Sequence, residues 1–234
     1  MNRISKSIDG YIYLCHGNET RDYAKNNLIL YIEKYLNPTS IILDIGANIG
    51  TCSIPMSNKN RKIYSFEPYT DSFQALCGNI FINNKTNITP LHFALTDSTN
   101  VNISPEEINS KILMDGNKKI NETYRPAQIN RSHFMLKTLD SFDFEKIDFI
   151  KLDSKGHELN VLMGGVNTIL KYKPIILFEC WSLDSICWTS IPNTYRQLMD
   201  YITYNLCYNI HKIEIDKVDG IDNYEAIPTY SKMQ

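Results

Sequence analysis

Short apolar runs alternate with amphipathic segments along the chain. Five runs are dense enough in apolar residues to be buried strands, and they lie at 41–44, 62–67, 88–95, 149–153 and 175–179. Apolar residues recur at helical spacing between them and predict helices at about 20–36, 71–83, 158–170 and 193–206. A strand–helix alternation of this kind predicts an open, mostly parallel sheet with helices on both faces.

Weaker patterns fill the remaining positions of this α/β fold. Short strands are expected at 10–14 and 134–139, and residues 208–215 and 223–228 alternate like a final hairpin. The result is a seven-stranded, mostly parallel sheet with an antiparallel C-terminal end. Helical spacing predicts which residues of two helices face the sheet. They are Phe73, Leu76, Ile80 and Phe81 in the helix at 71–83, and Leu159, Leu162, Val166, Ile169 and Leu170 in the helix at 158–170. A further helix after residue 50 should be kinked or begin late, because Pro55 lies near its start.

The 234 residues suit one well-cored domain, 1–234. Residues 1–40 are predicted to form an N-terminal strand and helix that cap the sheet. Residues 97–132 are polar and weakly periodic, and a segment of this length inside a domain is usually functional or disordered. We interpret it as an insertion over the mouth of the site, an acceptor lid.

The charge and the cysteines of the chain limit the partners and the cellular location that we expect. A net charge of -2 and a pI near 6.2 give no general attraction to nucleic acid or anionic lipid. The first ten residues lack the apolar core of a signal peptide, and no apolar run reaches membrane-spanning length, so we expect a cytoplasmic protein. Six cysteines without a C-x-x-C pair predict reduced thiols, and the spacing of Cys180, Cys187, Cys207 and His211 matches no common zinc site.

A glycine-rich segment follows the first strand, with the pattern Asp-x-Gly-x-Asn-x-Gly over residues 44–50. A strand that leads through such a turn into a helix gathers backbone N–H groups where nucleotide-like ligands bind. Gly46, Asn48 and Thr51 do not provide the three small residues of a dinucleotide fingerprint. Asp44 instead places a carboxylate beside the loop, which suits the ammonium of a methionine group. The pattern is similar to the S-adenosylmethionine loop of class I methyltransferases, with a dinucleotide site or a ligand-free turn as alternatives.

Acidic residues end four of the apolar runs. They are Asp44, Glu67, Asp153 and Glu179. The carboxyl ends of parallel strands meet at one edge of a sheet, so we expect these side chains to converge. Glu67 lies 21 residues after Gly46, a separation at which an acid can bind both ribose hydroxyls, although a helix cap is the alternative. Ala94 and Leu95 are expected near the adenine.

These features together resemble the FkbM-like methyltransferases, a class I S-adenosylmethionine-dependent family with a Rossmann-like fold. The matching segments occur in the family's order and span roughly 140 residues. They are LDIGANIG (43–50), YSFEP (64–68), ALTD (94–97), KTLDSF (137–142), IKLDSKGHELNVLMGG (150–165) and KPIILFE (173–179). The long segment through Gly165, followed by KPIILFE, is the most specific of them.

The resemblance implies O-methylation of a hydroxyl, often on a sugar or on a glycosylated or polyketide product. It implies cofactor contacts at Asp44, Gly46, Asn48, Gly50 and Glu67, and it places Asp153 and Glu158 at the reacting end. The chain departs from the family at three positions. Lys155 stands where Glu or Gln is usual, Met163 stands where Lys is usual, and Pro55 interrupts a helix that normally lacks proline.

Methyl transfer to oxygen requires a hydroxyl held close to the methyl group and a partner that removes its proton. We expect Asp153 to position or deprotonate the acceptor hydroxyl, and Glu158 and Glu179 to orient it. His157 has a suitable pKa for a base, although a solvent-facing histidine is the alternative. Three hard oxygen ligands would also suit a divalent ion, but we predict no metal.

The sequence therefore predicts an S-adenosylmethionine-dependent O-methyltransferase that acts on a sugar, a glycan or a glycosylated small molecule. An RNA ribose 2′-O-methyltransferase or a protein methyltransferase is the alternative, because Lys25, Lys151 or Lys155 near Asp153 would mimic a Lys–Asp–Lys–Glu set. The slightly acidic chain has no basic stripe, so no nucleic-acid partner is expected. A binding protein that has lost catalysis gains no support from the intact acids. No pattern indicates an oligomeric state.

Overall fold

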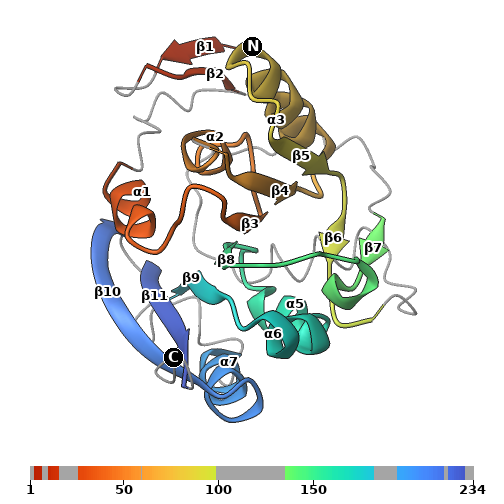
Figure 1. The fold of residues 1–234 in the computed structure, drawn as a ribbon, viewed down its shortest axis with the longest axis vertical. Helices are drawn as coiled ribbons and strands as arrows, with labels where there is room; N and C mark the ends of the chain where they lie inside the picture. Colours follow the sequence, from red (N-terminus) through yellow and green to blue (C-terminus); the bar gives the residue numbers. More distant parts are fainter. Residues whose placement is uncertain are drawn as a thin grey trace, which may run out of the picture.

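The structure is a computed structural model of the chain (Figure 1). It describes residues 3–6, 10–15, 26–58, 60–98, 135–181, 194–218 and 221–229. The predicted insertion at 97–132 therefore lies outside the described residues except for its first two positions, as does the first part of the helix predicted from residue 20.

A seven-stranded sheet forms the centre, in the order β10-β11-β9-β8-β3-β4-β5. Its strands are β3 (Ile41–Ile45), β4 (Lys62–Phe66), β5 (Ile88–Leu91), β8 (Phe149–Leu152), β9 (Ile175–Trp181), β10 (Tyr208–Val218) and β11 (Ile221–Pro228). The five strands from β5 to β9 run parallel, whereas β11 is antiparallel to both β9 and β10. The predicted seven-stranded sheet with an antiparallel C-terminal end is confirmed.

Helices cover both faces of the sheet, which gives three layers (Figure 1). One face packs on α1 (Asn26–Glu33), α2 (Ser53–Met56) and α3 (Thr70–Ile82), and the other on α5 (Glu158–Met163), α6 (Val166–Tyr172), α7 (Thr194–Asp200) and the π-helix η3 (Tyr201–Asn205). Successive strand residues point to opposite faces. Ile42 therefore belongs to the cluster under α1 and α3, and Leu43 to the cluster under α5 and α6.

The remaining elements are short. They are β1 (Arg3–Lys6), β2 (Ile12–Cys15), β6 (Ala94–Leu95), β7 (Leu136–Lys137) and the 3-10 helix η1 (Leu139–Ser141). The expected late start after the glycine-rich loop is confirmed, because α2 begins only at Ser53 and contains Pro55. No helix among the described residues has the length and apolar character needed to span a membrane.

The strand predicted at 88–95 is wrong in its second half. The chain leaves the main sheet after Leu91, and β6 pairs instead with β7 in a separate two-stranded sheet. The N–H groups of Ala94 and Thr96 donate to the carbonyl oxygens of Met135 and Lys137. The strand partners of β6 thus come from residues distant in the sequence. The pattern of apolar and polar residues within 88–95 did not reveal this pairing.

The helix predicted at 158–170 is divided by Gly164 and Gly165. A β-carbon on Gly164 would lie 1.9 Å from the carbonyl oxygen of Thr96, so the helix can approach this strand only through a glycine. The helix restarts as α6 at Val166. Leu162 and Ile169 are buried as expected, but Leu170 is 40% exposed, so its predicted inward position is wrong.

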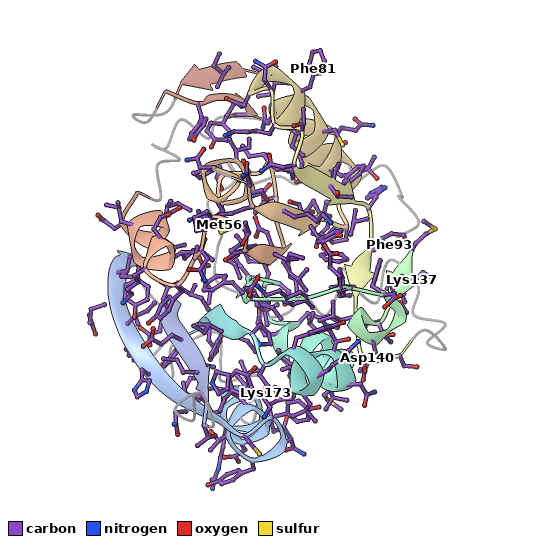
Figure 2. The ribbon with its side chains drawn as sticks, viewed as in Figure 1. Met56, Phe81, Phe93, Lys137, Asp140 and Lys173 are labelled. Carbon is purple, nitrogen blue, oxygen red and sulfur yellow. The ribbon has the colours of Figure 1, made fainter. Side chains whose placement is uncertain are left out.

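In α3 the predicted inner face is wrong at one position. Phe81 is 83% exposed, while the polar Asn79 is fully buried (Figure 2). The Asn79 Oδ1 accepts a hydrogen bond from the Leu14 N–H at 2.5 Å, and its Nδ2 donates to the Ile49 carbonyl at 2.9 Å. Asn79 thus links β2 and the glycine-rich loop to α3.

Replacing Asn79 with alanine should lower the free energy of unfolding by about 2–3 kcal/mol, because buried backbone groups of Leu14 and Ile49 would lose their partners. Phe81→Ala should change it by less than about 0.5 kcal/mol, since the ring is exposed. Urea denaturation of both variants checks this. Equal losses in the two variants would contradict the assignment.

Candidate functional site

The loop after β3 has an alternating backbone conformation. Gly46, Asn48 and Gly50 have positive φ angles of 77°, 50° and 92°, so every second residue is left-handed. Glycine adopts this region without strain and asparagine tolerates it better than most residues. The pattern Gly-x-Asn-x-Gly therefore fits this turn. The N–H groups of Gly46 and Ala47 both donate to the Phe66 carbonyl, at 3.0 and 2.9 Å, which fixes the loop to the end of β4.

Gly46 also permits a close contact between two loops. A β-carbon at this position would lie 1.9 Å from the carbonyl oxygen of Asp153. The N–H of Asp153 donates to the Ile45 carbonyl at 3.0 Å, so the ends of β3 and β8 are held together. The glycine-rich loop and Asp153 are consequently placed side by side by the backbone itself.

Below this contact lies a row of buried polar side chains. Parallel pairing sets Asp44 beside Ser65 on β4 and beside Lys151 on β8. The Ser65 hydroxyl donates to the Ser53 Oγ at 2.8 Å, and the Ser53 hydroxyl donates to the Asp44 Oδ2 at 2.5 Å. The exposed fractions of Asp44 and Lys151 are 0% and 3%. We call Ser53, Ser65, Asp44 and Lys151 the buried row.

Lys151 is the cation of the buried row. Its Nζ lies 3.5 Å from the Asp44 Oδ1 and 3.5 Å from the Asp153 Oδ2, and it donates to the Gly46 carbonyl at 3.3 Å. Burial lowers the pKa of Lys151, but the neighbouring negative groups, first Asp153 and then Asp44, outweigh burial, and the pKa lies well above its usual value. Lys151 is therefore charged. The Asp44 Oδ1 accepts no hydrogen bond from the described residues, which leaves capacity for a further donor.

The other three strand-end acids lie two residues further along the strands than Asp44. The pairing that aligns Ile45 with Phe66 and Leu152, and Leu152 with Phe178, aligns the following residues Glu67, Asp153 and Glu179 with Gly46. We call these three acids the carboxyl rim. The expected convergence is present, but Asp44 lies two residues below the rim, beneath the loop.

Glu67 is almost completely buried, with 4% of its surface exposed. Its Oε2 accepts from the Asn48 N–H at 2.8 Å and its Oε1 from the Tyr69 N–H at 2.9 Å. An ionised carboxylate can accept about four hydrogen bonds, so about two positions are left. Burial raises the pKa of Glu67 to about 7, although the Tyr69 and Asn48 N–H groups oppose the rise.

Asp153 and Glu179 share a second lysine. The Lys155 Nζ lies 2.6 Å from the Asp153 Oδ1 and 3.5 Å from the Glu179 Oε2. The two oxygens of Asp153 therefore face two different ammonium groups, Lys155 above and Lys151 below. Two lysines thus contact the residue proposed from the sequence to serve the acceptor.

Glu158 and His157 lie at the start of α5 and differ in their contacts. The Glu158 Oε1 accepts from the Ser154 N–H at 2.8 Å and its Oε2 from the Gly156 N–H at 3.0 Å. Burial raises the pKa of Glu158, and the N–H groups of Glu158 and Gly156 and the Ser154 hydroxyl oppose the rise. The half-buried His157 places its Nε2 3.3 Å from the Thr96 Oγ1. Glu158 thus organises the turn 154–156 rather than pointing away from it.

The remaining predicted cofactor contacts lie on β6. Ala94 is partly exposed, whereas the Leu95 side chain is 4% exposed and packs in the core under α5. A contact of these residues with adenine stays a prediction.

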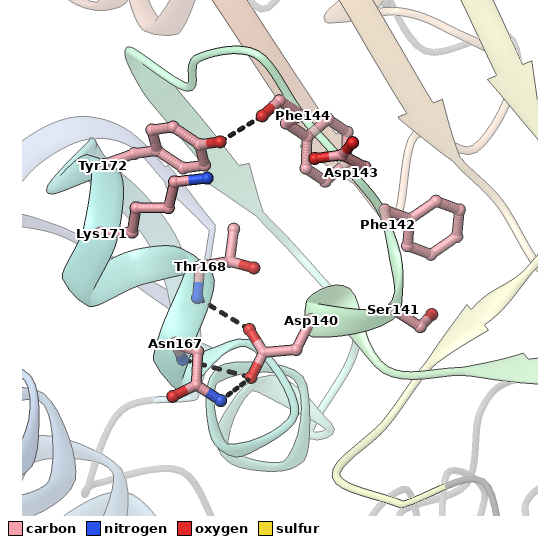
Figure 3. A pocket seen from close by; sticks show the side chains of 9 residues that line it. All are labelled: Asp140, Ser141, Phe142, Asp143, Phe144, Asn167, Thr168, Lys171 and Tyr172. Carbon is pink, nitrogen blue, oxygen red and sulfur yellow. Dashed lines mark hydrogen bonds between the residues drawn. The ribbon is translucent and has the colours of Figure 1, made fainter.

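A separate cavity of about 350 Å³ lies between η1 and α6 (Figure 3). It contains none of the predicted site residues, and it is lined by Asp140, Ser141, Phe142, Asp143, Phe144, Asn167, Thr168, Lys171 and Tyr172. The Asp140 carboxylate accepts hydrogen bonds from the N–H groups of Asn167 and Thr168 at the start of α6. This aspartate of the KTLDSF segment therefore caps a helix.

The sequence did not indicate Ser53 and Ser65, and it suggested Lys151 only for an alternative function. A lysine inside the apolar run of β8 is an available signal, because lysines are almost never fully buried unless paired. Finding its partners required the register of β3 against β8.

Comparison with known proteins gives a family match and relatives. The family described as the methyltransferase FkbM domain matches residues 44–205. Hexuronic acid methyltransferase AglP of Haloferax volcanii is 28% identical over 144 residues, which cover 58% of this chain and 54% of that protein. The chain thus matches about half the length of this curated relative.

Solved structures share the fold at low identity. The methyltransferase FkbM of Methylobacillus flagellatus KT has a TM-score of 0.58 and 16% identity, and covers 82% of this chain and 44% of its own. The tRNA (uracil-54, C5)-methyltransferase of Pyrococcus abyssi, in complex with S-adenosyl-L-homocysteine, has a TM-score of 0.55 and 14% identity over 97% of this chain and 44% of its own. These matches establish a Rossmann-like methyltransferase fold.

The raised pKa of Glu67 predicts a pH-dependent stability in the ligand-free protein. The unfolded chain releases this proton near pH 4.5 and the folded chain only near 7. The contribution of Glu67 is therefore fully present below pH 4.5 and is lost as the pH rises to 7, by up to about 3 kcal/mol. The side chain of the Glu67→Gln variant cannot titrate, so the variant's free energy of unfolding should lack this decrease with pH. It should differ from that of the original protein otherwise only by a constant. Urea denaturation from pH 4.5 to 7.5 checks this, and identical slopes in both proteins would contradict it.

Proposed function

Because the chain belongs to the methyltransferase FkbM domain family, we propose that it is a methyltransferase and transfers the methyl group of S-adenosylmethionine to a hydroxyl. The acceptor is a sugar, a glycan or a glycosylated small molecule. The observation that carries the proposal is the carboxyl rim, where Glu67 lies on one side of the glycine-rich loop and Asp153 and Glu179 on the other.

The donor side of the rim fits S-adenosylmethionine. Glu67 has capacity for two more hydrogen bonds, which the two ribose hydroxyls would supply. The Asp44 Oδ1 lies 3.5 Å from the Lys151 Nζ but accepts no hydrogen bond from the described residues. It would take a further hydrogen bond from the cofactor's ammonium through a water molecule, because Asp44 is buried below the loop. Gly46, Asn48 and Gly50 bring the backbone against the ligand between these acids. Bound there, the cofactor supplies an electrophilic methyl group on a sulfonium.

The acceptor side is assigned to Asp153. The sulfonium charge is lost in the transition state, so an acid that only bound this charge would not favour transfer. Asp153 instead accepts the hydrogen of the acceptor hydroxyl and positions its oxygen. Lys151 and Lys155 favour the ionised carboxylate, which is the form that accepts a proton.

The other candidates support Asp153. Glu179 shares Lys155 with it and orients the acceptor. Glu158 holds the turn 154–156 through its backbone N–H groups and acts as a positioning residue. His157, with Thr96 as its neighbour, lies further along the same edge and remains a second candidate base.

A saccharide acceptor is supported by three observations. AglP, which matches over about half its length, is a hexuronic acid methyltransferase. The chain carries a net charge of -2, whereas an enzyme that grips a nucleic acid must neutralise several phosphates. The proposed acceptor lid, residues 97–132, is rich in side chains that donate and accept hydrogen bonds, which suits sugar hydroxyls.

One observation favours a second candidate, an RNA ribose 2′-O-methyltransferase. Lys151 and Lys155 both contact Asp153, with Glu179 beside them, which is a Lys–Asp–Lys–Glu arrangement. The two lysines are already paired with carboxylates, so they add little positive charge for phosphates.

Labelled S-adenosylmethionine should therefore transfer its methyl group to a hydroxyl in a panel of glycans and nucleotide sugars, and mass spectrometry would locate it. Asp153→Asn keeps the side-chain shape but removes the base, so turnover should fall at least about 100-fold with cofactor affinity retained. Label on RNA ribose, with binding that weakens steeply in salt, would favour the second candidate. Activity within a fewfold in Asp153→Asn would show that Asp153 is structural.

A further inference from the structure

Lys155 occupies a backbone conformation that lysine rarely adopts. Its φ angle is 56° and that of the following Gly156 is 97°. A left-handed residue is usually glycine or asparagine, because a β-carbon crowds the backbone there. The carboxylate of Glu158 holds this turn by accepting from the N–H groups of Ser154 and Gly156. The turn is therefore built and fixed with a strained residue at its tip.

The strained turn directs the Lys155 side chain onto two carboxylates. Its Nζ lies 2.6 Å from the Asp153 Oδ1 at the end of β8 and 3.5 Å from the Glu179 Oε2 at the end of β9. The acid side chains are 9% and 13% exposed, whereas that of Lys155 is 55% exposed. Two shielded carboxylates on adjacent strand ends would repel each other, and one ammonium from the solvent side offsets this.

We propose that Lys155 is a positioning residue, a tethered cation that holds Asp153 and Glu179 together at the acceptor end of the site. Hard divalent cations bind pairs of carboxylates in a similar way, and a lysine ammonium is a compact point charge that donates three hydrogen bonds. This inference rests on the proposed function, in which Asp153 accepts the hydrogen of the acceptor hydroxyl. It adds the claim that the chain's own lysine aligns this acid.

The test variant is Lys155→Gly, which removes the ammonium and also relieves the left-handed strain. We expect an unchanged or higher melting temperature, a cofactor affinity within about threefold of the original, and a kcat/KM for the acceptor at least about tenfold lower. The pH at which turnover falls on the acid side should move upward, because Asp153 would lose one neighbouring cation while Lys151, Asp44, Glu179 and Glu158 remain.

A matched control comes from a second left-handed lysine. Lys173, labelled in Figure 2, has a φ angle of 48° and ends α6. It precedes the start of β9, so it lies at the opposite ends of the strands from the carboxyl rim. Lys173→Gly makes the same chemical change in the same backbone conformation. It should change thermal stability in the same direction and leave turnover and its pH profile unchanged. Lys155→Arg keeps the charge and should retain more turnover than Lys155→Gly.

Manganese titration provides a readout that does not need an acceptor. Once the ammonium is removed, Asp153 and Glu179 should bind Mn²⁺ in Lys155→Gly, detectable by calorimetry, and added Mn²⁺ should restore part of the turnover. The original protein and Lys173→Gly should show neither effect.

Two results would overturn the proposal. One is turnover within about twofold in Lys155→Gly, and the other is no difference in Mn²⁺ binding between this variant and the original protein. Failure of the acceptor assignment is distinguishable, because Asp153→Asn would then stay active while Mn²⁺ binding still responded to Lys155→Gly.

Discussion

The close approach of Gly46 to the Asp153 carbonyl sets the geometry of the whole edge. A side chain at position 46 would collide with this oxygen at 1.9 Å, so the loop after β3 can cross the end of β8 only with a glycine there. The contact holds the proposed donor loop against the proposed acceptor acid. Gly46 lies between Glu67 and Asp153 and has no side chain. A ligand that contacts both acids would therefore have to cross Gly46.

Charge is distributed over two levels below and around this contact. Three carboxyl groups, Asp44, Asp153 and Glu179, are paired with two ammonium groups, Lys151 and Lys155, and a fourth, Glu67, lies on the carboxyl rim. Lys151 is buried, where an unpaired charge would be very costly, and it is stabilised by Asp44 and Asp153 together. The surplus of carboxylates suits a cofactor that carries a sulfonium and an ammonium. The buried row thus fixes the loops after β3 and β8, and the carboxyl rim is the part proposed to contact the cofactor and the acceptor.

The parts of the fold that follow from local pattern were predicted from the sequence. The five parallel strands and the terminal hairpin are marked by apolar runs and alternation, and acids at strand ends predicted a shared edge. The apolar runs did not predict how far each acid lies below the carboxyl rim. Asp44 differs from Asp153 by two residues in register, and only the pairing of β3 with β8 shows that it lies beside Lys151 and not on the rim. Phe81 was expected inside but is exposed, whereas Asn79 is buried because backbone groups of β2 and of the glycine-rich loop, far away in sequence, require the asparagine.

The most direct test of the donor site is calorimetry of S-adenosylmethionine binding to the original protein and to Glu67→Ala. We expect a loss of about 2–4 kcal/mol in binding free energy, because two charge-assisted hydrogen bonds to the ribose would disappear. Glu145→Ala removes an exposed carboxylate that pairs with Lys62 and is absent from the carboxyl rim, and it should bind the cofactor normally. Equal affinity in the original protein and a folded Glu67→Ala variant would show that Glu67 does not bind the ribose hydroxyls.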